Sequence, residues 1–192
     1  MPLPKEQIYT EADYWNLPED IRAELINGQL YDMAAPSRIH QEILISLATL
    51  IRNHIRSNHD SCRVYPAPFA VKLRENKDDI VEPDITIVCD RSKLTDRGCT
   101  GAPDWIIEIV SPSNPGHDYV RKLNLYADAG VREYWIIDPM ENNVLVYFLE
   151  KDRFKCVAYT FKDKIAVGIC DDFMIDFAEL IAEIPTETDM RR

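Results

Sequence analysis

The chain has 192 residues, of which 46% are hydrophobic and 29% are charged. This length and this balance predict a single domain over residues 1–192 and exclude a largely disordered chain. No apolar run approaches the roughly 18 residues of a membrane helix, and the first residues lack the apolar core of a signal peptide. We therefore expect a cytoplasmic protein with no membrane segment.

The charge is strongly acidic, with 22 Lys and Arg against 33 Asp and Glu, which gives −11. Acidic proteins do not usually bind polyanions. The excess lies toward the ends, because residues 1–37 hold two basic and seven acidic groups and residues 141–192 hold seven and eleven. Residues 38–140 are nearly balanced, with 13 basic and 15 acidic groups. Chemistry on an anionic substrate is therefore expected in this middle segment.

The five cysteines are scattered along the chain. None forms a C-x-x-C pair, which argues against a zinc ribbon and favours a reducing cytoplasm. A chain of this length can also bury enough surface to fold without disulfides or a structural metal. The cysteines are Cys62, Cys89, Cys99, Cys156 and Cys170.

The first third of the chain carries clear start and turn signals. Thr10 is a suitable N-cap for a short helix over 10–16. The Asn27-Gly28 pair between two short apolar runs predicts a β-hairpin. Ser37 then begins a long helix, and His40 does not lie on the apolar stripe of that helix. The stripe is Ile39, Ile43, Leu44, Leu47, Leu50, Ile51 and Ile55.

The rest of the chain alternates strands with helices. Residues 104–110 form a nearly continuous apolar run, which is typical of a strand covered on both faces. The helix expected over 117–129 and the strand over 133–138 predict a right-handed crossover with parallel pairing. The class is α/β (α+β), a mixed central β-sheet flanked by helices, with a core over about 20–160. A strand is also expected at 64–73, where the sequence suits an edge or a bent strand, and another at 80–88, followed by a polar loop to 101. The last expected elements are a hairpin over 144–149 and 154–161 and a short helix and tail within 176–192.

Two acids fall in strands that otherwise look buried. Asp84 follows Pro83 in the expected strand over 80–88, and Glu108 has Ile106 and Val110 as its neighbours on the same face. Burying an unpaired charge costs several kcal/mol, so each carboxylate needs a partner. A cap or an arginine is one solution. The other is a hard cation such as Mg²⁺, which accepts one or two protein carboxylates together with water and phosphate oxygens.

Lys122 follows on the next expected helix. Asp118, Lys122 and Tyr126 are spaced four residues apart and so share one stripe of that helix. A crossover helix lies on the sheet, which brings Lys122 within reach of the two acids. The alternative is an exposed Asp118–Lys122 pair of a few tenths of a kcal/mol.

These residues resemble the PD-(D/E)XK nuclease superfamily, with Val110 at the usual lysine position and the lysine moved to Lys122. More specifically, the chain is similar to the Uma-type restriction endonuclease family over about residues 20–160. The matching stretches are Glu24 to Leu30, Pro36 to His40, Glu82 to Ile85, Gly101 to Ser113, Lys122 to Tyr126, and Gly130 to Pro139.

The resemblance implies an endonuclease-like fold and metal-dependent cleavage of DNA. Asp84, Glu108 and the main-chain carbonyl of Ile109 would hold Mg²⁺ or Mn²⁺, and Lys122 would orient water or stabilise developing charge. Glu24 is a supporting candidate, with a solvated hairpin carboxylate as the alternative. His40 is another, as a metal ligand or a phosphate contact, with a surface or capping role as the alternative.

Two other functions remain open. A nuclease fold without activity, acting as a binding or structural module, is suggested by the net charge and by Val110. A nuclease for single-stranded or structured nucleic acid is the other. A homodimer is expected for cutting both strands. A basic rim is a weak expectation, formed by Arg38, Lys72, Arg74, Arg91, Lys93, Arg97 and Arg121.

Overall fold

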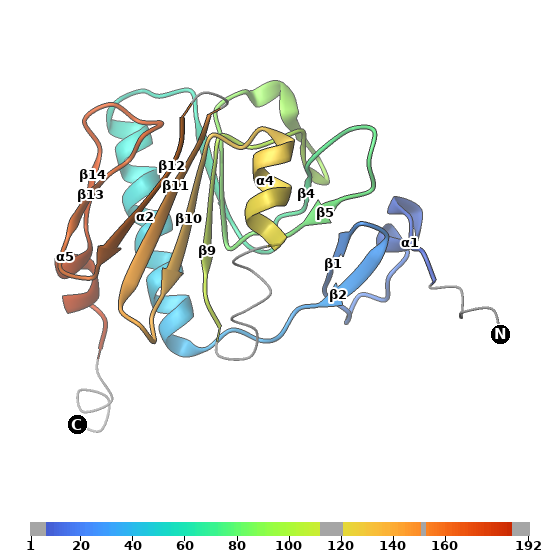
Figure 1. Ribbon diagram of the computed structural model, residues 1–192, viewed down its shortest axis with the longest axis horizontal. Helices are drawn as coiled ribbons and strands as arrows, with labels where there is room; N and C mark the ends of the chain where they lie inside the picture. Colours follow the sequence, from blue (N-terminus) through green and yellow to red (C-terminus); the bar gives the residue numbers. More distant parts are fainter. Residues whose placement is uncertain (1–6, 112–120, 151–152, 186–192) are drawn as a thin grey trace.

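A computed structural model describes residues 7–111, 121–150 and 153–185 (Figure 1). Its helices are α1 (Glu11–Trp15), α2 (Arg38–Ser57), the 3₁₀ turn η1 (Arg91–Lys93), α4 (Leu123–Ala129) and α5 (Phe177–Ala182). Its strands are β1 (Ala23–Ile26), β2 (Gln29–Asp32), β3 (Arg63–Pro66), β4 (Val71–Lys72), β5 (Ile80–Val81), β6 (Ile85–Val88), β7 (Leu94–Thr95), β8 (Gly98–Thr100), β9 (Trp105–Ile109), β10 (Glu133–Asp138), β11 (Asn143–Glu150), β12 (Arg153–Thr160), β13 (Lys164–Ala166) and β14 (Met174–Asp176).

The central sheet has the strand order β12-β11-β10-β9-β6-β3. Strands β9 and β10 are parallel, with Glu108 opposite Ile136, and the other pairs are antiparallel. This confirms the mixed sheet and the parallel crossover. Strand β3 lies at one edge of this sheet, as expected. An edge position suits Pro66, because proline has no amide hydrogen to donate to a neighbouring strand.

Side-chain alternation gives the central sheet two different faces. Trp105, Ile107 and Ile109 of β9 point into a core shared with α2, α5 and the β13–β14 ribbon. Ile106 and Val110 point to the other face, which α4 and the second sheet cover. Figure 1 shows α2 and α4 on opposite sides of the central strands. Both faces of β9 are therefore covered by packed side chains, which explains the continuous apolar run in the sequence.

The helix α2 forms where its cap and stripe predicted. The Ser37 side chain accepts a hydrogen bond from the His40 amide at 3.3 Å and so caps the N-terminus of the helix. Ile43, Leu47 and Ile51 are fully buried against the sheet. Burying three such side chains contributes roughly 1.5–3 kcal/mol each. This packing fixes α2 along the sheet and the position of its N-terminal turn.

A second sheet, ordered β2-β1-β5-β4-β8-β7, carries the N-terminal hairpin. Asn27 and Gly28 both have positive φ, 50° and 77°, as a tight hairpin turn requires. The Asn27 amide donates to the Asp79 carboxylate at 2.9 Å, and Arg74 binds the same carboxylate at 2.6 Å. The hairpin is thus anchored to the loop before β5, which sets the position of Glu24 on β1.

The structure corrects the strand expected over 80–88. It is two strands, because Pro83 lacks an amide hydrogen and interrupts the ladder. Strand β5 pairs with β1 and β4 in the second sheet, whereas β6 pairs with β3 and β9 in the central sheet. Asp84 therefore sits where the chain passes from one sheet to the other, instead of inside a strand.

Other differences are local. The strand expected over 64–73 is divided between β3 and β4, which belong to different sheets. The expected polar loop before Gly101 contains η1, β7 and β8. The ribbon β13–β14 was not expected. The start of the helix expected over 117–129 lies outside the described residues, and α4 begins at Leu123. The hairpins, α1 and α5 agree with the sequence expectations.

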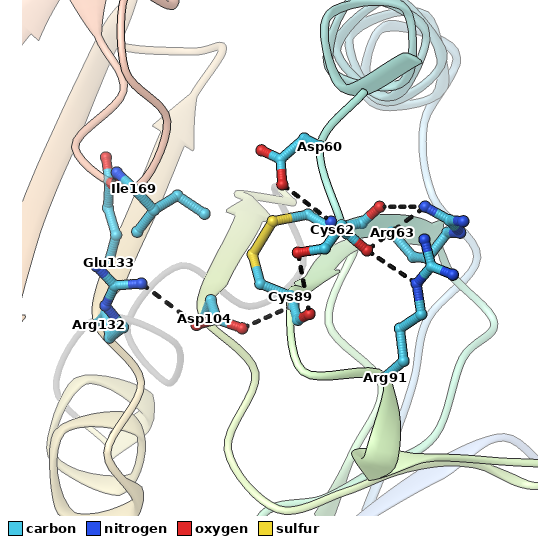
Figure 2. Close-up of a disulfide and its surroundings, with 10 residues drawn as sticks. Asp60, Cys62, Arg63, Cys89, Arg91, Asp104, Arg132, Glu133 and Ile169 are labelled. Carbon is cyan, nitrogen blue, oxygen red and sulfur yellow. Dashed lines mark hydrogen bonds and ion pairs between the residues drawn. A yellow bond between two sulfur atoms is a disulfide. The ribbon is translucent and has the colours of Figure 1, made fainter. Parts of the chain in front are cut away.

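Two of the scattered cysteines are joined. Cys62 and Cys89 form a disulfide, shown in Figure 2, between the residue before β3 and the residue after β6. The antiparallel pairing of Arg63 with Val88 brings the two cysteines opposite each other. The cysteine spacing in the sequence did not predict this disulfide, because the pairing depends on strand register across 27 residues.

Within the part of the chain that the structure describes, no helix is long and apolar enough to cross a membrane.

Replacing Gly98 by alanine is expected to destabilise the second sheet strongly. Its φ is +139°, and an added Cβ would lie 2.0 Å from the Ala70 carbonyl oxygen, with which β8 packs. Gly130 is the matched control, because its φ is +96° but no atom lies within 4 Å of the added Cβ. Urea denaturation should show a loss of about 1 kcal/mol for Gly130→Ala and about 3 kcal/mol or more for Gly98→Ala. Equal losses would contradict this close approach.

Candidate active site

A cavity of about 260 Å³ opens where the two sheets meet. Strands β1, β2 and β9, helix α2, and the residues just before β6 and α4 contribute to its wall. It is lined by Arg22, Glu24, Tyr31, Asp32, Met33, Ala34, Pro36, His40, Gln41, Leu44, Ala67, Asp84, Glu108, Ile109, Ser111 and Lys122. All of the candidate residues of the sequence analysis, namely Glu24, His40, Asp84, Glu108, Ile109 and Lys122, therefore face one space.

Asp84 is held by the main chain on both sides. Its Oδ2 accepts a hydrogen bond from the Ile109 amide at 2.7 Å, and its carbonyl accepts one from the Ala67 amide at 2.9 Å. Its side chain remains 15% exposed, toward the cavity. The carboxylate is thus fixed beside the end of β9, one residue beyond Glu108.

Glu108 points from β9 toward α4, on the face that holds Ile106 and Val110. Its Oε1 accepts hydrogen bonds from the Lys122 ammonium at 2.9 Å and from the Tyr126 hydroxyl at 2.7 Å. Its side chain is 7% exposed. These two donors offset the cost of burying the carboxylate.

Lys122 joins two acids from different sheets. Its Nζ lies 2.9 Å from Glu108 Oε1 and 3.0 Å from Glu24 Oε1. Glu24 also accepts a hydrogen bond from the Glu82 amide at 3.0 Å. The three ionisable side chains are each 7% exposed. Glu24 is therefore a buried member of the cluster, and the alternative of a solvated hairpin carboxylate is wrong.

The expected alternative for Lys122, an exposed pair with Asp118, does not fit its burial between Glu24 and Glu108. Asp118 itself lies outside the described residues. Two carboxylates around one ammonium leave a formal charge of −1 in a nearly dry space. In such surroundings each charge interacts far more strongly than in water.

Tyr126 was on the stripe of Lys122 in the sequence, but its contact with Glu108 was not foreseen. Burial, followed by the neighbouring charge of Glu108, raises the pKa of the Tyr126 hydroxyl well above its ordinary value of 10. The hydroxyl therefore keeps its proton at neutral pH and always donates to Glu108. The i+4 spacing from Lys122 was the available signal, because both side chains then reach the same carboxylate.

His40 is buried, so the alternative of a surface residue is wrong. Its Nε2 lies 3.1 Å from Asp84 Oδ2, and its side chain is 6% exposed. Its Nδ1 is buried and has no hydrogen-bond partner within residues 7–111, 121–150 and 153–185. The first turn of α2 thus points the imidazole into the cavity wall beside Asp84.

The expected basic rim does not surround this cavity. None of its seven members lines the cavity among the described residues. Lys72 is paired with Glu11 at 2.7 Å, and Arg74 is paired with Asp79. The guanidinium of Arg121 lies 4.2 Å from the centre of the Tyr31 ring. The cation that lines the cavity beside Lys122 is Arg22, which the sequence analysis did not select.

The residues present fit a hard divalent cation with two protein carboxylates. Among the described residues no three His, Cys, Asp or Glu side chains converge as a ligand set. Asp84, Glu108 and Ile109 nevertheless line the same cavity, and their oxygens are the hard donors that Mg²⁺ prefers. Mg²⁺ commonly keeps several waters and takes only one or two carboxylates, so a third acidic ligand is not required.

Comparisons with known proteins agree with this architecture. A crystal structure from Anabaena variabilis ATCC 29413, described as "a putative nuclease belonging to DUF820", superposes with a TM-score of 0.75 at 21% identity. The match covers 90% of this chain and 97% of the other. The two proteins therefore share a mixed α+β fold.

Residues 10–168 match the Uma2 family, which is described as "Putative restriction endonuclease". The chain belongs to this family, and the match confirms the resemblance seen in the sequence. "Uncharacterized protein slr1290" of Synechocystis sp. (strain ATCC 27184 / PCC 6803 / Kazusa) is 24% identical over 139 residues. That alignment covers 72% of each chain.

Removing the ammonium of Lys122 is expected to destabilise the metal-free protein. Lys122→Met leaves Glu24 and Glu108 buried without their shared cation, which should lower the free energy of unfolding by about 3–5 kcal/mol. Lys155→Met is the matched control, because Lys155 is exposed on β12, and it should change stability by less than about 0.5 kcal/mol. A loss below 1 kcal/mol for Lys122→Met in urea denaturation would show that the buried cluster does not form.

Proposed function

We propose that this protein is a metal-dependent endonuclease that hydrolyses phosphodiester bonds in DNA and acts as a homodimer. One observation carries the proposal. Asp84, just before β6, and Glu108, on the neighbouring strand β9, face the same cavity, and the Lys122 ammonium lies 2.9 Å from Glu108. The family and the fold support it. Two copies of the site are needed to cut both strands of a duplex, and twofold dimers are the commonest oligomers.

Asp84, Glu108 and the Ile109 carbonyl would hold Mg²⁺ or Mn²⁺. Such an ion, when bound, lowers the pKa of a water ligand and neutralises charge on the phosphate. The protein's own contribution is to hold both carboxylates in place. The Ile109 amide fixes Asp84, and the Tyr126 hydroxyl fixes Glu108.

Lys122 supplies a positive charge at the inner wall of the cavity. A phosphate that enters beside Glu108 would bring its non-bridging oxygens close to this ammonium, which stabilises the negative charge that develops during attack. Glu24 holds the ammonium from the opposite side at 3.0 Å. Lys122 thus takes the place of the lysine that Val110 does not provide.

His40 is proposed as a positioning residue. Its Nε2 lies 3.1 Å from Asp84 Oδ2, so it restricts the rotation of that carboxylate. The inactive-module alternative remains a distinct outcome, since Val110 occupies the usual lysine position. The cleavage measurements that follow separate the two.

Asp84→Asn and Glu108→Gln should each lower the rate of Mg²⁺- or Mn²⁺-dependent nicking of supercoiled plasmid by at least about 100-fold. The amides keep an oxygen for the Ile109 and Tyr126 donors, so folding should survive, but they lose the charge that binds the cation. Asp128→Asn, at an exposed position of α4, is the control and should cut as the unmodified chain does. Full activity in either active-site variant would refute the two-carboxylate site, and an inactive parent chain would favour the binding module.

Lys122→Met should lower the single-turnover cleavage rate by roughly 100-fold or more, which is about 2.7 kcal/mol of transition-state stabilisation. The measurement belongs at a temperature where circular dichroism shows the variant folded. DNA binding in EDTA should change little, because one ammonium is a small part of the contact. A folded variant with full cleavage activity would exclude Lys122 and leave Arg121, a chain of water molecules, or the cavity cation Arg22 as candidates.

A further inference from the structure

The long helix and the strand after it reverse the charge of the chain locally. Residues 43–74 contain five Lys and Arg and a single acid, Asp60, in a protein whose net charge is −11. No acid occurs between Glu42 and Asp60, which covers most of α2. This segment is therefore the place in the sequence where a polyanion meets least repulsion.

The structure places three of these five cations, Arg52, Arg56 and Arg63, around a groove of about 670 Å³ between the C-terminal half of α2 and the edge strand β3. Arg52 and Arg56 lie at exposed positions of α2. Within the described residues, neither guanidinium group forms a hydrogen bond or an ion pair. The groove is lined by Arg52, Ile55, Arg56, His59, Asp60, Cys62, Arg63, Val64 and Tyr65. It is thus a hollow rich in arginine, with two guanidinium groups available to a ligand.

The one acid at the groove is already engaged. The Asp60 carboxylate accepts a hydrogen bond from the Cys62 amide at 3.1 Å, so it closes the turn that leads from α2 to β3. The groove is lined by three arginines, so their positive charges outnumber the single negative charge of Asp60. The lining therefore carries a net positive charge, and His59 adds to it when protonated.

The floor beside the groove is tied in place. Arg63 donates to the Cys62 carbonyl at 2.7 Å, and Arg91 donates to the Ser61 carbonyl at 3.0 Å. Figure 2 shows both guanidinium groups on the same side of the Cys62–Cys89 disulfide. Side chains that are held before a ligand arrives lose less conformational entropy on binding.

Strand β3 and helix α2 both connect the groove to the active-site cavity. Arg63, the first residue of the strand, lines the groove, and Ala67, just after its last residue, lines the cavity. Four residues of extended chain span about 13 Å. On α2, Arg52 and Arg56 lie about 18–24 Å beyond the cavity residue His40 at 1.5 Å per residue. These distances correspond to roughly four to seven nucleotides of a duplex strand at a rise of 3.4 Å.

We propose that this arginine groove binds the phosphate backbone of DNA on one side of the bond to be cut. Arg52, Arg56 and Arg63 would contact phosphates roughly four to seven nucleotides from the cavity. The location of the cut relative to the groove rests on the proposed function, whereas binding at the groove does not. The groove also explains how so acidic a chain can hold a polyanion, because it confines the contacts to the one basic segment.

The test compares Arg52→Gln/Arg56→Gln with Lys155→Gln/Lys162→Gln, which removes the same charge from exposed positions on and after β12, at the opposite edge of the central sheet. Binding of a fluorescent 20-bp duplex is measured by anisotropy in EDTA, across a series of salt concentrations. For the parent chain the slope of log K against log salt should be about −2 to −4. The arginine pair should weaken binding on the order of tenfold or more at low salt and make the slope shallower by about two.

The lysine pair should change the affinity less than about threefold, because it removes only a long-range contribution. Equal losses in both double variants, or no loss in the arginine pair, would overturn the proposal. So would binding of RNA or of vesicles with anionic lipids in preference to the duplex. If the arginine pair loses binding but the parent chain cuts no plasmid, the groove stands and the proposed endonuclease function fails.

Discussion

The buried contact of Lys122 with Glu24 and Glu108 is the interaction on which the arrangement of the site depends. The three side chains come from α4's N-terminus, the hairpin strand β1 and the central strand β9, so one ammonium joins both sheets to the helix. Neither carboxylate is stable at this depth without a cation or donors. The same charges that hold the elements together therefore define the chemical character of the cavity.

The break at Pro83 has an equally direct consequence. Because it sends β5 and β6 into different sheets, Asp84 lies at their junction, with its carboxylate bonded to the Ile109 amide. A continuous strand would have placed this acid in a packed layer. The junction instead leaves it 15% exposed, facing the cavity beside His40. The proposed metal site and the topology of the two sheets thus have the same origin.

Much of the architecture is readable from local patterns, because caps, turns and apolar periodicity act over a few residues. The Asn27-Gly28 turn, the Ser37 cap and the run around Glu108 are examples. Contacts that depend on register are not readable in this way. The position of His40 off the apolar stripe left a surface role open beside a site role, and only the packing of α2 on the central sheet shows its contact with Asp84. The Cys62–Cys89 pair and the groove of Arg52 and Arg56 likewise require the placement of β3.

The central claim is that Asp84 and Glu108 together form a cation site at the junction of the sheets. Crystals of the protein soaked in Mn²⁺ test it most directly, by an anomalous difference map at the manganese edge. The account predicts one strong peak between the two carboxylates, within about 2.0–2.4 Å of an oxygen of each. A peak that lies elsewhere on the protein, with none between Asp84 and Glu108, would contradict it.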